Sequence, residues 1–245
     1  MKISLISGAS SGIGASITRE LDSYGLDELW LIGRSQDKLM LTASSLTTKT
    51  RILALDLSDN QSFDFITKQL SSTHAQIEYL VLSAGVGSNG RFDSLSSEKI
   101  KGMLDVNVAG LTLMLKASLP FVSNGGKIIN IASAAGFLPQ PDFAVYSATK
   151  AYVISLSRAI RREVRKNKIS VTAVCPGPVD TEFFSSLENV KEYKRKHLIS
   201  PEKVARGALS ASKRNKAIYT PTLSMKLVHL ASKILPTSLI MKFYK

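Results

Sequence analysis

Ile3-Ser4-Leu5-Ile6-Ser7 is an apolar run that leads directly into Gly8-Ala9-Ser10-Ser11-Gly12-Ile13-Gly14. A helical pattern follows, so the stretch predicts a strand, a glycine-rich turn and a helix. Glycines allow a tight turn and let the backbone approach a pyrophosphate, which then sits at the helix N-terminus. The spacing differs from the usual G-x-G-x-x-G, and we interpret the segment as a variant dinucleotide-binding loop. For the segment alone, a purely structural glycine-rich turn is an alternative.

The same alternation of apolar runs and helical patterns continues along most of the chain. It predicts a single-domain Rossmann-type α/β fold, a doubly wound parallel β-sheet with helices on both faces. We expect this domain to span residues 1–222 and a helical tail to span residues 223–245. The further expected strands are Glu28–Gly33, Ile52–Leu55, Tyr79–Leu82, Lys127–Ala132, Ile169–Val174 and Ala217–Thr220.

Composition describes a globular protein. The 245 residues are 44% hydrophobic and 21% charged, and one cysteine, Cys175, excludes an intrachain disulfide and is expected to be inert core packing. The histidines have no metal-ligand spacing, so no metal is expected. No apolar run approaches the length of a transmembrane helix, and we expect a cytoplasmic protein.

The net charge of +13 is compatible with nucleic acid, an anionic membrane surface, or solubility together with an anionic cofactor. No nucleic-acid motif accompanies the charge, and the aromatic residues are not interleaved with the basic ones. We therefore expect no nucleic-acid partner.

Residues suited to ligand binding follow the predicted strand ends, and in open α/β sheets ligands bind along that edge. Arg34 directly follows the second expected strand. At this position an acidic side chain would suit a ribose 2′-OH, whereas an arginine suits a 2′-phosphate. NADP(H) is therefore expected in preference to NAD(H). The other residues in such positions are Gly8, Asp56, Gly85, Ser133 and Pro176-Gly177.

Tyr146 and Lys150 stand four residues apart at the start of a predicted helix, so they share one face. A phenol and an ammonium side by side can tune each other's proton affinity, as a general acid/base requires. For the isolated pair, an ordinary helix face is the alternative. Asn107, in the middle of a predicted helix from about Ser97 to Leu119, indicates either a local distortion or a tolerated surface residue.

These motifs, in this order, resemble the classical short-chain dehydrogenase/reductase (SDR) family over about residues 2 to 222. The resemblance implies that Asn107, Ser133, Tyr146 and Lys150 are the catalytic set. Tyr146 would exchange a proton with the substrate oxygen, Ser133 would stabilise that oxygen, Lys150 would hold the nicotinamide ribose, and Asn107 would bend its helix and support a water relay. The implied cofactor-binding residues are Gly8, Ser10, Ser11, Gly12, Ile13, Gly14, Arg34, Asp56, Leu57, Ala84, Gly85, Tyr146, Lys150, Pro176, Gly177, Val179 and Thr181.

The chain departs from the family pattern twice. Ser7 replaces the usual threonine and keeps the hydroxyl, and Leu82-Ser83-Ala84-Gly85 lacks the amide of the usual Asn-Asn-Ala-Gly. Neither departure touches the chemistry that the resemblance implies.

The function expected from the resemblance is an NADP(H)-dependent carbonyl reductase or alcohol dehydrogenase, acting as a dimer or tetramer. Phe137–Phe143 and Glu182–Ile199 are expected to line the substrate site, and Phe137, Leu138 and Phe143 favour an apolar ketone, aldehyde or alcohol. An epimerase or dehydratase would need a larger carboxyl-terminal domain. A non-catalytic NADP-binding regulator or scaffold would commonly lack one of the catalytic residues, and here all those positions are filled.

The tail is apolar and basic. Lys213–Lys245 contains seven Lys and Arg residues and no Asp or Glu, and Leu227, Leu230 and Ile234 recur at helical spacing before Pro236. One interpretation is a helix packed on the core or at a subunit contact. The other is an amphipathic segment on an anionic membrane surface.

Overall fold

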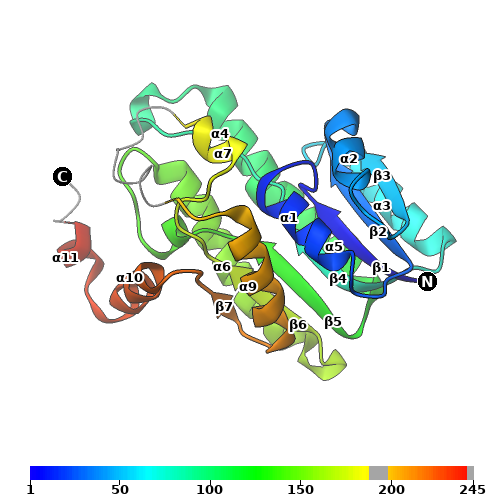
Figure 1. The fold of residues 1–245 in the computed structure, drawn as a ribbon. Helices are drawn as coiled ribbons and strands as arrows, with labels where there is room; N and C mark the ends of the chain where they lie inside the picture. The colour runs from blue at the N-terminus through cyan, green and yellow to red at the C-terminus, as the bar shows by residue number, and fades with distance from the viewer. Residues whose placement is uncertain (188–197, 242–245) are drawn as a thin grey trace.

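A parallel sheet of seven strands forms the centre of the computed structural model, which describes residues 1–187 and 198–241 (Figure 1). The strand order is β3-β2-β1-β4-β5-β6-β7, and neighbouring strands pair in parallel. The expected doubly wound sheet is confirmed. The strands are Lys2–Ser7 (β1), Glu28–Gly33 (β2), Thr50–Ala54 (β3), Gln76–Leu82 (β4), Val122–Ile131 (β5), Ser170–Val174 (β6) and Ile218–Tyr219 (β7).

Helices cover both faces of this sheet (Figure 1). One buried cluster unites the apolar residues of α1, α2 and α9 with the sheet, and a second unites those of α3, α5 and α6 with the other face. The helices are Gly12–Leu21 (α1), Gln36–Ala43 (α2), Gln61–Ser72 (α3), Ser97–Leu104 (α4), Leu111–Ser118 (α5), Ala144–Glu163 (α6), Glu182–Ser185 (α7), Pro201–Lys213 (α9), Leu223–Ile234 (α10) and Thr237–Met241 (α11). Short 3₁₀ turns are Phe92–Ser94 (η1), Leu119–Phe121 (η3), Ala134–Phe137 (η4) and Val164–Asn167 (η5).

The strand order reverses between β1 and β4, the point where open α/β sheets bind ligands. Ser7 pairs with Leu82 in the register of these strands, so the segments that follow them leave the sheet side by side. The Ser7 hydroxyl accepts hydrogen bonds from the backbone N–H groups of Ser83 at 3.2 Å and Ala84 at 3.3 Å. The hydroxyl that Ser7 retains therefore joins the two segments.

Ser200-Pro201-Glu202 has the pattern of an N-cap residue, a first-turn proline and a first-turn acid, and it predicts the start of a helix. Ser200 caps α9, because its hydroxyl accepts from the N–H of Lys203 and Pro201 is the first helical residue. Ser58 and Asp59 follow the expected strand Ile52–Leu55 and are residue types that cap helices, but the helix after β3 begins at Gln61. Asp59 nevertheless accepts a hydrogen bond from the Gln61 N–H at 2.9 Å.

The continuous helical stretch Ser97–Phe121 has the length and apolar composition of a membrane-crossing helix. It packs against β4, α3 and α6, as a core helix of a globular domain does.

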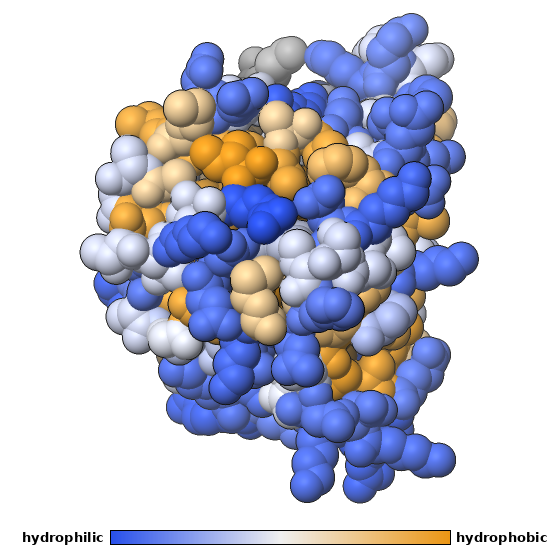
Figure 2. Space-filling view, turned by 90° about the vertical axis from the view of Figure 1, so that its right-hand side faces the viewer, coloured by the Kyte–Doolittle hydropathy of each residue, from blue (hydrophilic) through white to orange (hydrophobic). Residues whose placement is uncertain are grey.

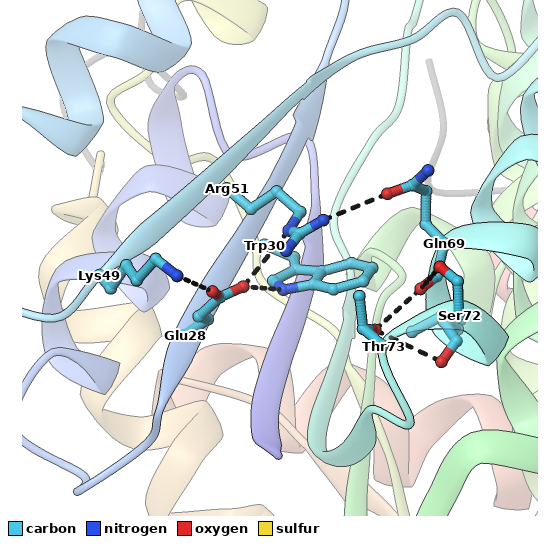
Figure 3. A network of polar contacts seen from close by, with 8 residues as sticks. Glu28, Trp30, Lys49, Arg51, Gln69, Ser72 and Thr73 are labelled. Atoms are coloured by element: carbon cyan, nitrogen blue, oxygen red, sulfur yellow. Dashed lines mark hydrogen bonds and ion pairs between the residues drawn. The ribbon is translucent and has the colours of Figure 1, made fainter.

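A buried carboxylate secures the edge of the sheet (Figure 3). Glu28, at the start of β2, accepts a hydrogen bond from the Trp30 indole at 2.8 Å and pairs with Lys49 and Arg51. The Arg51 guanidinium lies 4.6 Å from the centre of the Trp30 ring and donates to Gln69 on α3. This network attaches the edge strand β3 to β2 and α3.

We predict that Glu28→Gln lowers the free energy of unfolding by about 1–3 kcal/mol near neutral pH, because the substitution leaves Arg51 without its buried counter-charge. Burial alone would raise the pKa of Glu28. The hydrogen bonds from Lys49 and Trp30 and the charge of Arg51 together outweigh this effect, so the pKa is lowered from its usual value. The contribution is therefore complete above the unfolded pKa of about 4.3 and is lost as the pH falls through the folded pKa.

Urea titrations between neutral and acid pH measure this effect, with the exposed Glu163→Gln as the control. A deficit for Glu28→Gln that stays constant into strong acid, or no deficit at neutral pH, would contradict the role given to the carboxylate.

Candidate active site

The glycine loop after β1 presses against the segment after β4. Gly8 has a φ of +68°, and a Cβ at this position would lie 2.7 Å from the backbone nitrogen of Ala84. A Cβ on Gly14 would lie 2.1 Å from the carbonyl oxygen of Gly8. Gly8 and Gly14 must therefore be glycine, because any side chain would collide with neighbouring backbone atoms. The sequence predicted a glycine-rich turn at this position.

The loop opens the N-terminus of α1. Ser11 occupies the N-cap position with extended backbone, its side chain makes no capping hydrogen bond in the described part of the chain, and the first turn holds no acidic residue. The first N–H groups of the helix are thus available to an anion. Ser10 lies beside Gly33, at the end of β2, and Ile13 packs on the core.

Arg34 follows β2 with an exposed side chain. It lies close enough to Asp56 to help lower the pKa of that carboxyl, whose main cause is the hydrogen bond from the Ser58 N–H. Leu57 is buried, and its carbonyl oxygen would be 2.6 Å from a Cβ on Gly110. Arg34, Asp56 and Leu57, three of the implied cofactor-binding residues, therefore lie together beyond the ends of β2 and β3.

Asn107 is 1% exposed and lies in a π-helical segment, Asp105–Gly110. Its side-chain oxygen accepts from the Val86 N–H at 2.9 Å, and its amide donates to the Val86 carbonyl at 2.8 Å and to Thr149 at 3.2 Å. A Cβ on Gly85 would lie 3.2 Å from the Asn107 oxygen and 3.4 Å from the Lys150 nitrogen. The interpretation of Asn107 as a surface residue is wrong, and that of a local helix distortion is confirmed.

Tyr146 and Lys150 lie in the first turns of α6 and are 7% and 4% exposed. The Lys150 ammonium donates to the Ile131 carbonyl at 3.0 Å and lies 5.6 Å from the centre of the Tyr146 ring. Ser133 follows β5, and its hydroxyl accepts from the Ala135 N–H at 3.1 Å. Because that bond uses an acceptor position, the Ser133 proton can be donated, and the Tyr146 hydroxyl lies within its reach.

Burial shifts both titrating groups of the pair toward their neutral forms. It raises the pKa of Tyr146 well above that of a free tyrosine, although the hydrogen bond with Ser133 acts in the opposite direction. Burial lowers the pKa of Lys150 to about 8. Near neutral pH the site thus holds a protonated phenol beside an ammonium whose pKa is lowered toward neutrality. Burial also raises the pKa of Cys175 to about 12, as expected of an inert core thiol.

The segment after β6 borders the glycine loop. The Pro176 carbonyl accepts from the Ala134 N–H at 2.8 Å, and Val179 is buried. A Cβ on Gly12 would lie 3.0 Å from the Thr181 methyl carbon. The segment after β6 thus packs against the glycine loop. The glycine loop, the ends of β4 and β5, the start of α6 and this segment lie together at one edge of the sheet.

Individual side-chain contacts around Tyr146 and the glycine loop were missed by sequence reasoning. Phe183 on α7 packs at 5.4 Å from the Tyr146 ring, against Gly87, where a Cβ would be 2.5 Å from the Phe183 ring. Phe143 stacks on Tyr146 at 4.4 Å. Lys38, one turn after Arg34, forms an exposed ion pair with Glu182 at 2.8 Å. Phe143 and Phe183 come from the two segments that were expected to line the site, Phe137–Phe143 and Glu182–Ile199, and residues 188–197 of the second lie outside the described residues.

Metal chemistry has no candidate site in the described ranges 1–187 and 198–241, which contain no group of three or more His, Cys, Asp or Glu residues able to hold an ion.

Comparisons with known proteins point to one family. The family model for short chain dehydrogenase matches residues 2–192. An uncharacterized oxidoreductase of Staphylococcus epidermidis is 33% identical over 182 residues, which are 74% of this chain and 79% of the relative.

Two solved structures share the fold over nearly the whole chain. A short-chain dehydrogenase from Sphingobium yanoikuyae in complex with NADPH has a TM-score of 0.83 at 26% identity and covers 100% of this chain and 97% of its own. The 3-ketoacyl-(acyl-carrier-protein) reductase from Brucella melitensis, complexed with NADH, has a TM-score of 0.79 at 25% identity and covers 91% and 98%.

We predict that Asn107→Ala lowers the free energy of unfolding by about 2–4 kcal/mol, because the N–H and carbonyl of Val86 lose their partner inside the protein. Hydrogen exchange should accelerate at the Val86 amide. Asn167→Ala, at an exposed position, is the control. Unchanged stability and unchanged exchange at Val86 would remove Asn107 from this structural role.

Proposed function

The chain belongs to the short-chain dehydrogenase/reductase family, and on this premise we propose that it is an NADP(H)-dependent oxidoreductase acting on ketones, aldehydes or secondary alcohols. The observation that carries the proposal is the buried pair of Tyr146 and Lys150 beside Ser133 and Asn107, at the reversal point of the sheet. A buried phenol and ammonium at that edge suit proton transfer to a carbonyl oxygen.

The residues present fit a dinucleotide. Gly8 and Gly14 leave no space for a Cβ, and their loop ends at a helix N-terminus without a capping side chain, which suits a pyrophosphate. The Lys150 ammonium has one protein acceptor within the described ranges, the Ile131 carbonyl, so further N–H donors can reach ribose hydroxyls. The bound nicotinamide would supply or accept the hydride.

Each member of the proposed catalytic set has a distinct task. Tyr146 donates its phenol proton to the substrate oxygen during reduction, and the upward shift of its pKa keeps that proton in place near neutral pH. Ser133 donates a hydrogen bond to the same oxygen and stabilises the charge that develops there. Asn107 forms hydrogen bonds with the backbone of Val86 and thereby holds the loop that contains Gly85 and Val86 next to the Lys150 ammonium.

The preference for NADP(H) rests on Arg34. Its exposed guanidinium follows β2, where a 2′-phosphate would be recognised, and the strand-end residues Gly33, Arg34 and Ser35 include no acid. Solved relatives are bound to NADPH in one case and NADH in another, so the preference is a property proposed for this chain's own residues.

The proposed substrate is apolar near its carbonyl group. Phe143 and Phe183 both pack on the Tyr146 ring, and Gly87 leaves space for the Phe183 ring. A panel of aliphatic and aromatic ketones, followed through NADPH absorbance, tests the substrate class.

We predict that Tyr146→Phe lowers kcat/KM for carbonyl reduction by about a hundredfold or more while NADPH affinity stays within a few-fold, because only the phenol proton is lost. Tyr152→Phe on the same helix is the control. If Tyr146→Phe retains activity within a few-fold of wild type, Tyr146 is not the proton donor. NADPH binding without turnover of any carbonyl by the wild type would favour a non-catalytic regulator.

We predict that the wild type uses NADPH in preference to NADH, and that Arg34→Ala lowers the ratio of the two kcat/KM values at least tenfold, about 1.4 kcal/mol. The lost charge-assisted hydrogen bonds to the 2′-phosphate are the reason. Arg165→Ala, at an exposed position beyond the opposite end of the sheet, should leave the ratio unchanged. Equal use of both cofactors by the wild type would overturn the assignment.

A further inference from the structure

The tail projects from the domain as two helices, α10 and α11, on the side opposite the first strands (Figure 1). The inner side of α10 lies on residues near the candidate active site. His229 contacts the Phe137 ring at 4.2 Å between centres, and the Met225 sulfur would lie 3.1 Å from a Cβ on Gly177. The tail is therefore attached to the domain through one of its faces.

The outer side of α10 carries a row of bare apolar side chains. Leu223, Leu227, Leu230 and Ile234 are 70%, 59%, 53% and 69% exposed. Their spacing of four, three and four residues places them on one face of the helix. Leu235 and Leu239 continue the apolar surface toward α11 and are 44% and 42% exposed. A contiguous patch of this kind marks an interaction surface.

The positive charge of the tail indicates the kind of partner that this face would bind. Lys226 and Lys233 are exposed on α10 among the bare leucines. From Lys203 to the last residue, the sequence contains nine Lys and Arg residues and no Asp or Glu. In a two-fold contact, a second copy would present the same basic helix. An anionic lipid surface would instead offer phosphate groups to the lysines and acyl chains to the leucines.

We propose that the outer face of α10, continued by α11, docks on the surface of an anionic lipid bilayer. The row from Leu223 to Ile234 enters the boundary between headgroups and acyl chains, and Lys226 and Lys233 lie at the level of the phosphates. The proposal goes beyond the oxidoreductase activity, and vesicle binding can be measured without turnover.

Docking would also fix the orientation of the candidate active site. The inner side of α10 contacts η4, which directly follows Ser133, so the substrate side of the domain would be held near the lipid. Figure 2 shows the face on the side of the first strands, away from the tail, where hydrophilic side chains surround separate apolar patches. That face would point toward water.

The test uses the full-length protein and flotation with two kinds of vesicle, phosphatidylcholine alone and phosphatidylcholine mixed with phosphatidylglycerol. We expect binding to the anionic vesicles at low salt and a marked loss at high salt. Leu227→Gln should weaken this binding about tenfold, because a leucine leaves the acyl boundary. Leu41→Gln is the matched control, because Leu41 is 74% exposed on α2.

A second pair of variants tests the charge. Lys226→Gln should weaken anionic binding and reduce its salt dependence, whereas Lys166→Gln, at an exposed position before β6, should not. Failure of the wild type to float with anionic vesicles at low salt would overturn the proposal. So would a change in subunit number, measured by light scattering, for Leu227→Gln with unchanged flotation, because that result assigns the face to a second copy.

Discussion

Lys150 is only 4% exposed, so its ammonium group lies inside the protein. The neighbouring structure has to accommodate this buried charge. A buried charge must be hydrogen-bonded or it shifts toward its neutral form, and here both effects operate. The Ile131 carbonyl accepts one hydrogen bond, and burial lowers the pKa of Lys150 to about 8. Gly136 permits the close approach, because a Cβ there would lie 2.6 Å from the Lys150 carbonyl carbon. The helix α6 is thereby fixed against the end of β5, and Tyr146 is fixed with it.

Much of the fold follows from local sequence. The apolar runs and glycine turns predict the alternation of strands and helices, and the right-handed connections of parallel strands leave few other arrangements. The i, i+4 spacing of Tyr146 and Lys150 predicts that they share a helix face. Strand ends predict which residues meet at one edge of the sheet. Ser200 predicts the start of α9 because its capping bond is made within the same turn. All these inferences need only periodicity, turn chemistry and the polarity of strands.

Contacts between segments distant in sequence could not be predicted in this way. Phe183 packs against Gly87, and Lys38 on α2 pairs with Glu182, because the irregular segment between β6 and α7 determines where α7 lies. The sequence marked Asn107 as unusual but left its location open, since burial depends on how α4 and α5 meet the sheet. The tail presented the same difficulty. Its helical period was readable, but only packing on Phe137 and Gly177 shows which face remains bare.

The central claim is that this cleft transfers hydride between a nicotinamide and a carbonyl carbon. The most direct measurement follows deuterium from NADPH labelled at both C4 positions into the products of an apolar ketone panel, detected by mass spectrometry. The account predicts an alcohol that carries deuterium on its carbinol carbon. Binding of the labelled cofactor with no labelled alcohol from any ketone or aldehyde would contradict it.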